Sequence, residues 1–149
     1  MFKKWMEKSK KDQRGLTLVE LLAVVVILAI VAAIAFVLIG NVMENSRKDA
    51  HIANAQQIIS AAKMYDSTVE PIKGKEITLA QLQEEKLIDK TIQNPWKGET
   101  YVTNENVKIT KNDDGEFSIS AFSVTGKCEL TKDPVTESDL NKEGRNLCK

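Results

Sequence analysis

The hydrophobic pattern of the chain is dominated by one run, because residues 21–39 contain no polar side chain. Nineteen apolar residues in succession are enough to cross the hydrocarbon core of a bilayer as a helix. Fourteen of them are Leu, Val, Ile or Phe, and at about 0.3 to 0.6 kcal/mol each they favour insertion by roughly 4 to 8 kcal/mol. We therefore predict a transmembrane helix at residues 16–40, preceded by a short segment at 1–15.

Beyond this run, apolar residues recur every three or four positions, at 52, 55, 58, 59, 62 and 65, while polar residues take the other faces. No proline precedes Pro71. The pattern predicts one helix from Leu16 to about Tyr65, apolar all round in its first half and amphipathic over residues 41–66. A span followed by a separate helix after Gly40 is the alternative, because Gly and Asn are poor helix formers.

Residues 67–149 are predicted to form a small globular head of helix and strand. Thr78 and Gln81 have capping-box spacing, which predicts a helix of about ten residues. About eighty residues of such material cannot bury a large core alone, so we expect the head to pack on the amphipathic helix. The fold class is therefore α+β, a long N-terminal helix against a small antiparallel sheet. Strands are predicted at residues 100–103, 107–110 and 117–124.

Two local signals refine these strands. Residues 112–115 read Asn-Asp-Asp-Gly, which is the tightest turn signal in the head. The alternation of apolar and polar residues changes phase at Ala121 and Phe122. A phase change of this kind predicts a bulge or the end of the third strand.

The charge is divided at the start of the span. Residues 1–15 carry five Lys and one Arg against two acids, a net charge of +4, so a chain of net charge zero leaves −4 on residues 16–149. Basic residues ahead of a span hold that end in the cytoplasm, which predicts an external C-terminus. A weakly acidic exterior argues against a general nucleic-acid binder. It leaves open a local contact of a few lysines with DNA.

Glu20 is the one acidic residue at the entrance to the apolar run. A carboxylate in a span costs up to about 2.5 to 3.5 kcal/mol, and less near the end of the span, so insertion still wins. Two general interpretations of this N-terminus are a removed signal peptide, with an A-x-A pattern at residues 33–35, and a plain signal anchor. The first would leave four apolar residues behind the cut, and neither explains Glu20.

A specific interpretation starts from the motif around Glu20. Gly15, an apolar residue, then Thr-Leu-Val-Glu and a long Leu/Val/Ile/Ala run resemble the class III leader and first helix of type IV pilins and pseudopilins. The resemblance covers about residues 10–35. It implies that residues 1–15 are a leader, that a prepilin peptidase cuts between Gly15 and Leu16, and that Leu16 is N-methylated. The family usually has Phe where this chain has Leu16.

The resemblance also gives Glu20 a role that physical chemistry supports. Cleavage would expose an ammonium group on Leu16 at a helix N-terminus, four residues from the carboxylate. In a bundle of such helices, the Glu20 of one subunit could pair with the Leu16 amine of the next. A subunit docked at the wrong height would leave both charges buried and unpaired, so Glu20 is predicted to fix the axial register.

The implied function is a structural subunit of a type IV pilus-like filament, favoured here as the major pilin of a competence or surface pilus. Its implied partners are other pilin subunits, the prepilin peptidase, a membrane assembly platform, the cytoplasmic membrane and, for DNA uptake, DNA. The precursor would be a single-pass protein of the cytoplasmic membrane, later part of a cell-surface filament. A type II secretion pseudopilin is the alternative, and a membrane-anchored binding or sensor protein that never polymerises is the alternative from another class.

A second, weaker resemblance lies at residues 94–98, Asn-Pro-Trp-Lys-Gly. Major pseudopilins often have Asp-Pro-Trp-Gly at the entrance to their sheet. Pro95 fixes the turn, and Trp96 is the large side chain predicted to cover the small core. An exposed contact role for Trp96 is the alternative.

Cys128 and Cys148 both lie in the predicted exterior part, where a disulfide is the default. Closing a loop of this size is worth about 3 kcal/mol in the chain-entropy model. The pair also resembles the disulfide-bounded C-terminal loop of many type IV pilins.

No pattern of catalytic residues is found, so we predict that the protein is not an enzyme. The single histidine, His51, is interpreted as a solvated side chain on the helix. No cofactor is predicted. Calcium remains a minor possibility, because carboxylates gather in two loops and some related pseudopilins bind calcium near the C-terminus. Solvated turns are the preferred interpretation of both clusters, which are Asp113, Asp114 and Glu116, and Asp133, Glu137 and Asp139.

Overall fold

The computed structural model describes residues 2–89, 92–96 and 106–149. Its first element, α1 (Phe2–Thr68), is helical throughout, including Gly40 and Asn41. The chain divides into two compact units, Met1–Met43 and Glu44–Lys149, so α1 belongs to the first unit by its N-terminal part and to the second by its C-terminal part. Helix was predicted across the junction after Gly40, and the structure agrees.

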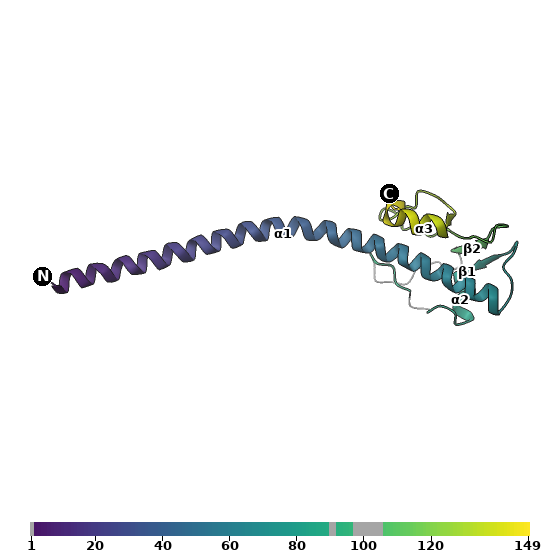
Figure 1. The fold of residues 1–149 in the computed structure, drawn as a ribbon, viewed down its shortest axis with the longest axis horizontal. Helices are drawn as coiled ribbons and strands as arrows, with labels where there is room; N and C mark the ends of the chain where they lie inside the picture. The colour runs from purple at the N-terminus through teal and green to yellow at the C-terminus, as the bar shows by residue number, and fades with distance from the viewer. Residues whose placement is uncertain (1, 90–91, 97–105) are drawn as a thin grey trace. The chain divides into compact units, whose positions relative to one another are not determined.

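The second unit contains a four-stranded antiparallel sheet in the order β1-β2-β3-β4. One short helix, α2, lies between β1 and β2 along the chain, and α3 follows β4 (Figure 1). This is the α+β fold expected from the sequence. The elements after α1 are β1 (Glu76–Thr78), α2 (Leu79–Glu84), β2 (Lys108–Lys111), β3 (Phe117–Ser120), β4 (Val135–Thr136), α3 (Glu137–Glu143) and a 3-10 helix, η1 (Gly144–Leu147).

One row of apolar residues crosses the sheet. Ile77 pairs with Ile109, Ile109 with Ile119, and Ile119 with Val135, and all four side chains are buried. Branched side chains opposite one another are the pairs that stabilise antiparallel sheets. The sheet therefore contributes a continuous apolar stripe to the core.

The C-terminal part of α1 supplies the rest of the core, as its periodicity predicted. Its apolar side is buried, and Tyr65 packs against the same cluster while half exposed. Burying this face provides the apolar surface that a head of this size lacks alone. The buried residues of the stripe are Ile52, Ala55, Ile58, Ile59, Ala61 and Ala62.

The predicted strands are confirmed in part. Residues 107–110 overlap β2, and the third strand ends at Ser120, where Ala121 takes a φ of 56°. The phase change therefore marks a strand end. The strand expected at 100–103 lies outside the described residues, and β1 and β4 were not predicted, because two or three residues are too few to show alternation.

The helix expected after Thr78 is present but shorter than predicted. α2 has six residues, and both halves of its capping box are made: the Thr78 hydroxyl accepts from the Gln81 backbone N–H, and the Gln81 side chain accepts from the Thr78 N–H. The helix ends at Glu84 with Glu85 as its C-cap, and Lys86 follows with a φ of 59°. The apolar positions at 87 and 88, which suggested a longer helix, belong to the turn after it.

Thr78→Ala should destabilise the chain by about 1 kcal/mol, because it removes an N-cap that satisfies an otherwise free backbone N–H of α2. Urea unfolding of the full chain in detergent, followed by far-UV circular dichroism, would measure the change. Thr125→Ala, in an exposed turn, is the matched control and should leave the unfolding midpoint unchanged. An equal midpoint for both variants would contradict the capping contribution.

Candidate functional site

The residues of the N-terminal motif all lie on α1. Gly15, Leu16 and Glu20 fall within the helix, and Glu20 is exposed on its surface. Residues four apart lie on the same side of a helix, separated by about 6 Å along its axis. An amine created on Leu16 by cleavage and the Glu20 carboxylate would therefore share one side of the helix.

The apolar run after Glu20 is uncovered in the single chain. Its large side chains are exposed along the helix, as the exposures of Leu21 at 67% and Phe36 at 84% illustrate. The candidate span lies within Thr17–Thr68. Its most apolar stretch has a mean hydropathy of 3.5, and no part of that stretch is buried within the structure. Surface of this extent requires a bilayer or partner helices, which fits a membrane-anchored precursor.

A second group of side chains surrounds His51 in the head unit. The interpretation of His51 as solvated is wrong, because its side chain is 0% exposed. Its Nε2 lies 2.8 Å from the Phe122 carbonyl oxygen, and its ring stacks on the Phe122 ring at 4.4 Å between centroids. The Trp96 ring meets it edge-on at 5.7 Å. Burial lowers the pKa of His51 from 6.5 to about 4, against the opposing effect of the Phe122 carbonyl.

The periodicity of α1 contained the signal for this burial. His51 precedes Ala55 by four residues and Ile58 by seven, so it continues the buried side of the helix by one further turn. Because histidine is polar, it was not counted among the apolar positions that predicted the buried side of α1. A neutral imidazole that is hydrogen-bonded, stacked on one aromatic ring and in edge contact with another can replace an apolar core residue.

Trp96 covers part of the core, as predicted. The side chain is half-buried and packs against the core, while its indole N–H donates to Glu44 Oε1 at 2.9 Å. Its own backbone N–H donates to the Asn94 side chain at 3.0 Å, which fixes the turn around Pro95. Lys97 and Gly98, the rest of the loop that resembles pseudopilins, lie outside the described residues.

The C-terminal loop is closed by a disulfide between Cys128 and Cys148, as predicted. Three polar pairs attach this loop to α1. The residues on α1 are spaced seven apart and their partners on the loop four apart, so the members of each set lie on one side of the helix. The α3 helix accordingly runs beside α1 (Figure 1). The pairs are Asp49 with Arg145, Gln56 with Asn141, and Lys63 with Glu137.

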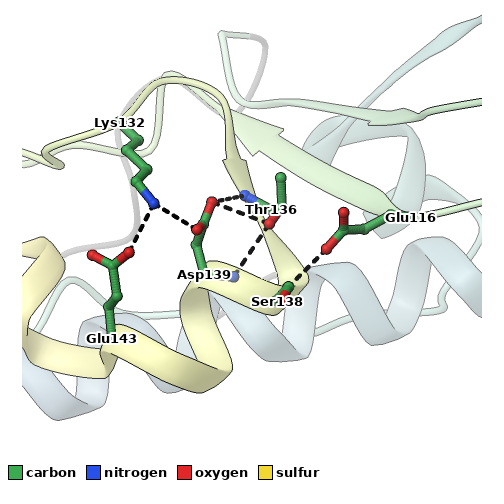
Figure 2. A network of polar contacts seen from close by, with 6 residues as sticks. All are labelled: Glu116, Lys132, Thr136, Ser138, Asp139 and Glu143. Atoms are coloured by element: carbon green, nitrogen blue, oxygen red, sulfur yellow. Dashed lines mark hydrogen bonds and ion pairs between the residues drawn. The ribbon is translucent and has the colours of Figure 1, made fainter. Parts of the chain in front are cut away.

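Lys132 holds the carboxylates of this loop together. Figure 2 shows its ammonium between Asp139 and Glu143, with Nζ–O distances of 2.6 and 2.7 Å. These hydrogen bonds raise the pKa of Lys132 to about 12, and the bond from Lys132 lowers the pKa of Asp139. The second Asp139 oxygen accepts from the Thr136 N–H and completes the capping box of α3. One ammonium is therefore shared by the two carboxylates.

The two carboxylate clusters considered for calcium are used differently. Glu116 accepts from the Ser138 backbone N–H, Asp133 accepts from the Ala121 N–H, and Glu137 pairs with Lys63. Asp113 and Asp114 are exposed in the turn between β2 and β3. Among the described residues, no group of three or more His, Cys, Asp or Glu side chains is placed to hold a metal ion.

We expect calcium or EDTA to leave the melting temperature of the unaltered protein unchanged, because the Lys132 ammonium already occupies the position of a cation between Asp139 and Glu143. Lys132→Met should lower the melting temperature, since Asp139 and Glu143 would then face each other without a cation. Differential scanning fluorimetry of the full chain in detergent would measure both effects, with the exposed Lys127→Met as control. A calcium-dependent rise in the unaltered protein would contradict this expectation.

The comparisons with known proteins bear on the N-terminal segment. Residues 10–36 match the family model of the prokaryotic N-terminal methylation motif. No curated protein and no solved structure matches the chain. The matched range contains Gly15, Leu16 and Glu20 and most of the apolar run, so it coincides with the part of α1 described above. The methylation motif, together with the α+β fold behind it, supports a relationship of the chain to type IV pilins and pseudopilins.

Proposed function

We propose that the protein is a structural subunit of a type IV pilus-like filament, made as a membrane precursor, cut between Gly15 and Leu16 and methylated on Leu16. The observation that carries this proposal is the methylation motif at residues 10–36, which continues without interruption into the apolar part of α1. The motif implies processing by a prepilin peptidase and assembly with other subunits of the same family.

The N-terminal unit supports polymerisation on physical grounds. Once a subunit leaves the bilayer, its exposed apolar helix needs other apolar surfaces, and the same segment of neighbouring subunits supplies them. Glu20 then pairs with the Leu16 amine of the next subunit and sets the axial register. The basic residues of the leader keep the N-terminus cytoplasmic and the head unit outside.

A filament built in this way needs no catalysis by its subunits, so we propose a structural and not an enzymatic role. Among the branches of the family we favour a competence or surface pilus, with which the small head is compatible, and we favour a major over a minor pilin because Glu20, the acidic residue for register, is present. A type II secretion pseudopilin is the second candidate, favoured by the Asn94-Pro95-Trp96 turn, which resembles a loop of major pseudopilins.

Mass spectrometry of the mature N-terminus, with electron microscopy of material sheared from cells, tests the proposal. We expect a chain that starts at a methylated Leu16, together with thin filaments that contain it. An intact N-terminus and no filaments would refute the proposal and support a membrane-anchored binding or sensor protein.

Deletion of the gene separates the branches. Loss of DNA uptake with normal protein secretion would support the competence pilus. Loss of secretion with normal DNA uptake would support the pseudopilin.

A further inference from the structure

The segment ahead of the cleavage site has a helical face of its own. α1 is helical from Phe2, so its first residues are distributed around the axis at about 100° per residue. Positions 2, 5, 6, 9 and 13 then fall within an arc of about 100° and carry Phe, Trp, Met, Ser and Gln. Asp12 borders this face. The five lysines of the segment and Arg14 fall outside it.

Membrane orientation alone does not require this arrangement. The positive-inside rule depends on the number of Lys and Arg residues near the span, whatever their helical phase. Phased aromatic and apolar residues opposite a basic face are instead typical of helices that lie in the plane of a membrane surface. The net charge of +4 complements the anionic lipids of a cytoplasmic leaflet.

We propose that residues 2–14 dock as an in-plane helix on the anionic phospholipid surface of the cytoplasmic leaflet before the leader is removed. The apolar face, with Phe2, Trp5 and Met6, enters the headgroup boundary, and the basic residues contact lipid phosphates. This proposal rests on the membrane orientation given under Proposed function. It does not depend on polymerisation.

Docking requires a bend where the in-plane helix meets the transmembrane one. The structure has continuous helix through Gly15, and on a bilayer the bend falls at that residue, because glycine is the weakest helix former in residues 2–39. The bond between Gly15 and Leu16 then lies at the membrane surface, where the helix is most easily opened. The leader thereby positions its own cleavage site for a membrane peptidase.

Fluorescence of Trp5 in the full-length precursor tests the docking. The chain has two tryptophans, so Trp96→Phe leaves Trp5 as the single reporter. In vesicles that contain phosphatidylglycerol, we expect emission at shorter wavelength and weaker quenching by acrylamide than in vesicles of phosphatidylcholine alone. Removing one lysine, as in Lys10→Gln, should lower the ratio of docked to free leader about fivefold.

The matched control exchanges two residues, Met6→Lys with Lys8→Met, which preserves composition and net charge but breaks the apolar face. Its Trp5 should be quenched equally in both vesicles. Equal quenching of Trp5 in both vesicles, in the precursor without the exchange, would overturn the proposal. Two other results would also overturn it: Trp5 that stays protected from acrylamide in the exchanged variant, and Trp5 that is protected only when prepilin peptidase is added. A docked leader on a chain that never forms filaments would refute the proposed function and leave this inference standing.

Discussion

Glu20→Ala should abolish filament assembly while the precursor is still inserted, cut and methylated. Removing one member of a buried charge pair leaves the other without a partner, at a cost of about 3 to 5 kcal/mol. That cost lowers the equilibrium constant for assembly of membrane subunits into the filament by roughly a hundredfold or more. The measurement is the amount of the protein in the sheared filament fraction relative to the mature form in the membrane.

The effect should depend on charge and not on side-chain volume. Glu20→Gln keeps the shape and one hydrogen-bond acceptor, so it should assemble better than Glu20→Ala but worse than the unaltered chain. Val19→Ala truncates an exposed neighbour at the same depth and should change the yield little. A normal filament yield for Glu20→Ala would disprove the register role even if the chain is a pilin subunit.

The sequence predicted the elements whose signals are long. The apolar run and the three-to-four spacing after it extend over about fifty residues of α1, so a single unfavourable residue such as Gly40 did not interrupt the pattern. The same spacing identified the buried face that begins at Ile52. The short strands β1 and β4 were missed, because their stability comes from pairing with β2 and β3 and not from their own sequence.

The candidate site also contains residues with a local sequence signal and residues that only the completed fold brings together. Gly15, Leu16 and Glu20 lie close together in the chain, so a local motif suffices to nominate them as candidates. The group around His51 joins α1 to residues 45 and 71 positions further along the chain, Trp96 and Phe122. Contacts of that separation depend on the completed fold, and the polarity of histidine suggested solvent instead of core.

The stability of the protein should fall by about 2 kcal/mol between pH 7 and pH 5, because of His51. Its pKa is about 4 in the folded chain against 6.5 as the ordinary value, so the unfolded chain binds a proton first as the pH falls. The folded state is therefore destabilised progressively below pH 6.5, and the loss reaches about 3 kcal/mol at pH 4. Asp66, whose pKa is lowered by Lys111, loses its contribution only below its ordinary value of 3.8, in a separate window. Urea unfolding of the full chain in detergent at several pH values measures the slope.

His51→Gln removes the titrating group, so its stability should change little between pH 7 and pH 5. Because that variant also alters the stacking on Phe122, a direct titration provides the second measurement. The chain has one histidine, so its ring protons give an unambiguous NMR signal, and we expect them to titrate near pH 4. A midpoint near 6.5 would contradict burial of the neutral ring. If the midpoint is low, acid below pH 5 should first loosen the part of the head that packs over His51 through Trp96 and Phe122, because exposing the ring relieves the cost of burying its charge.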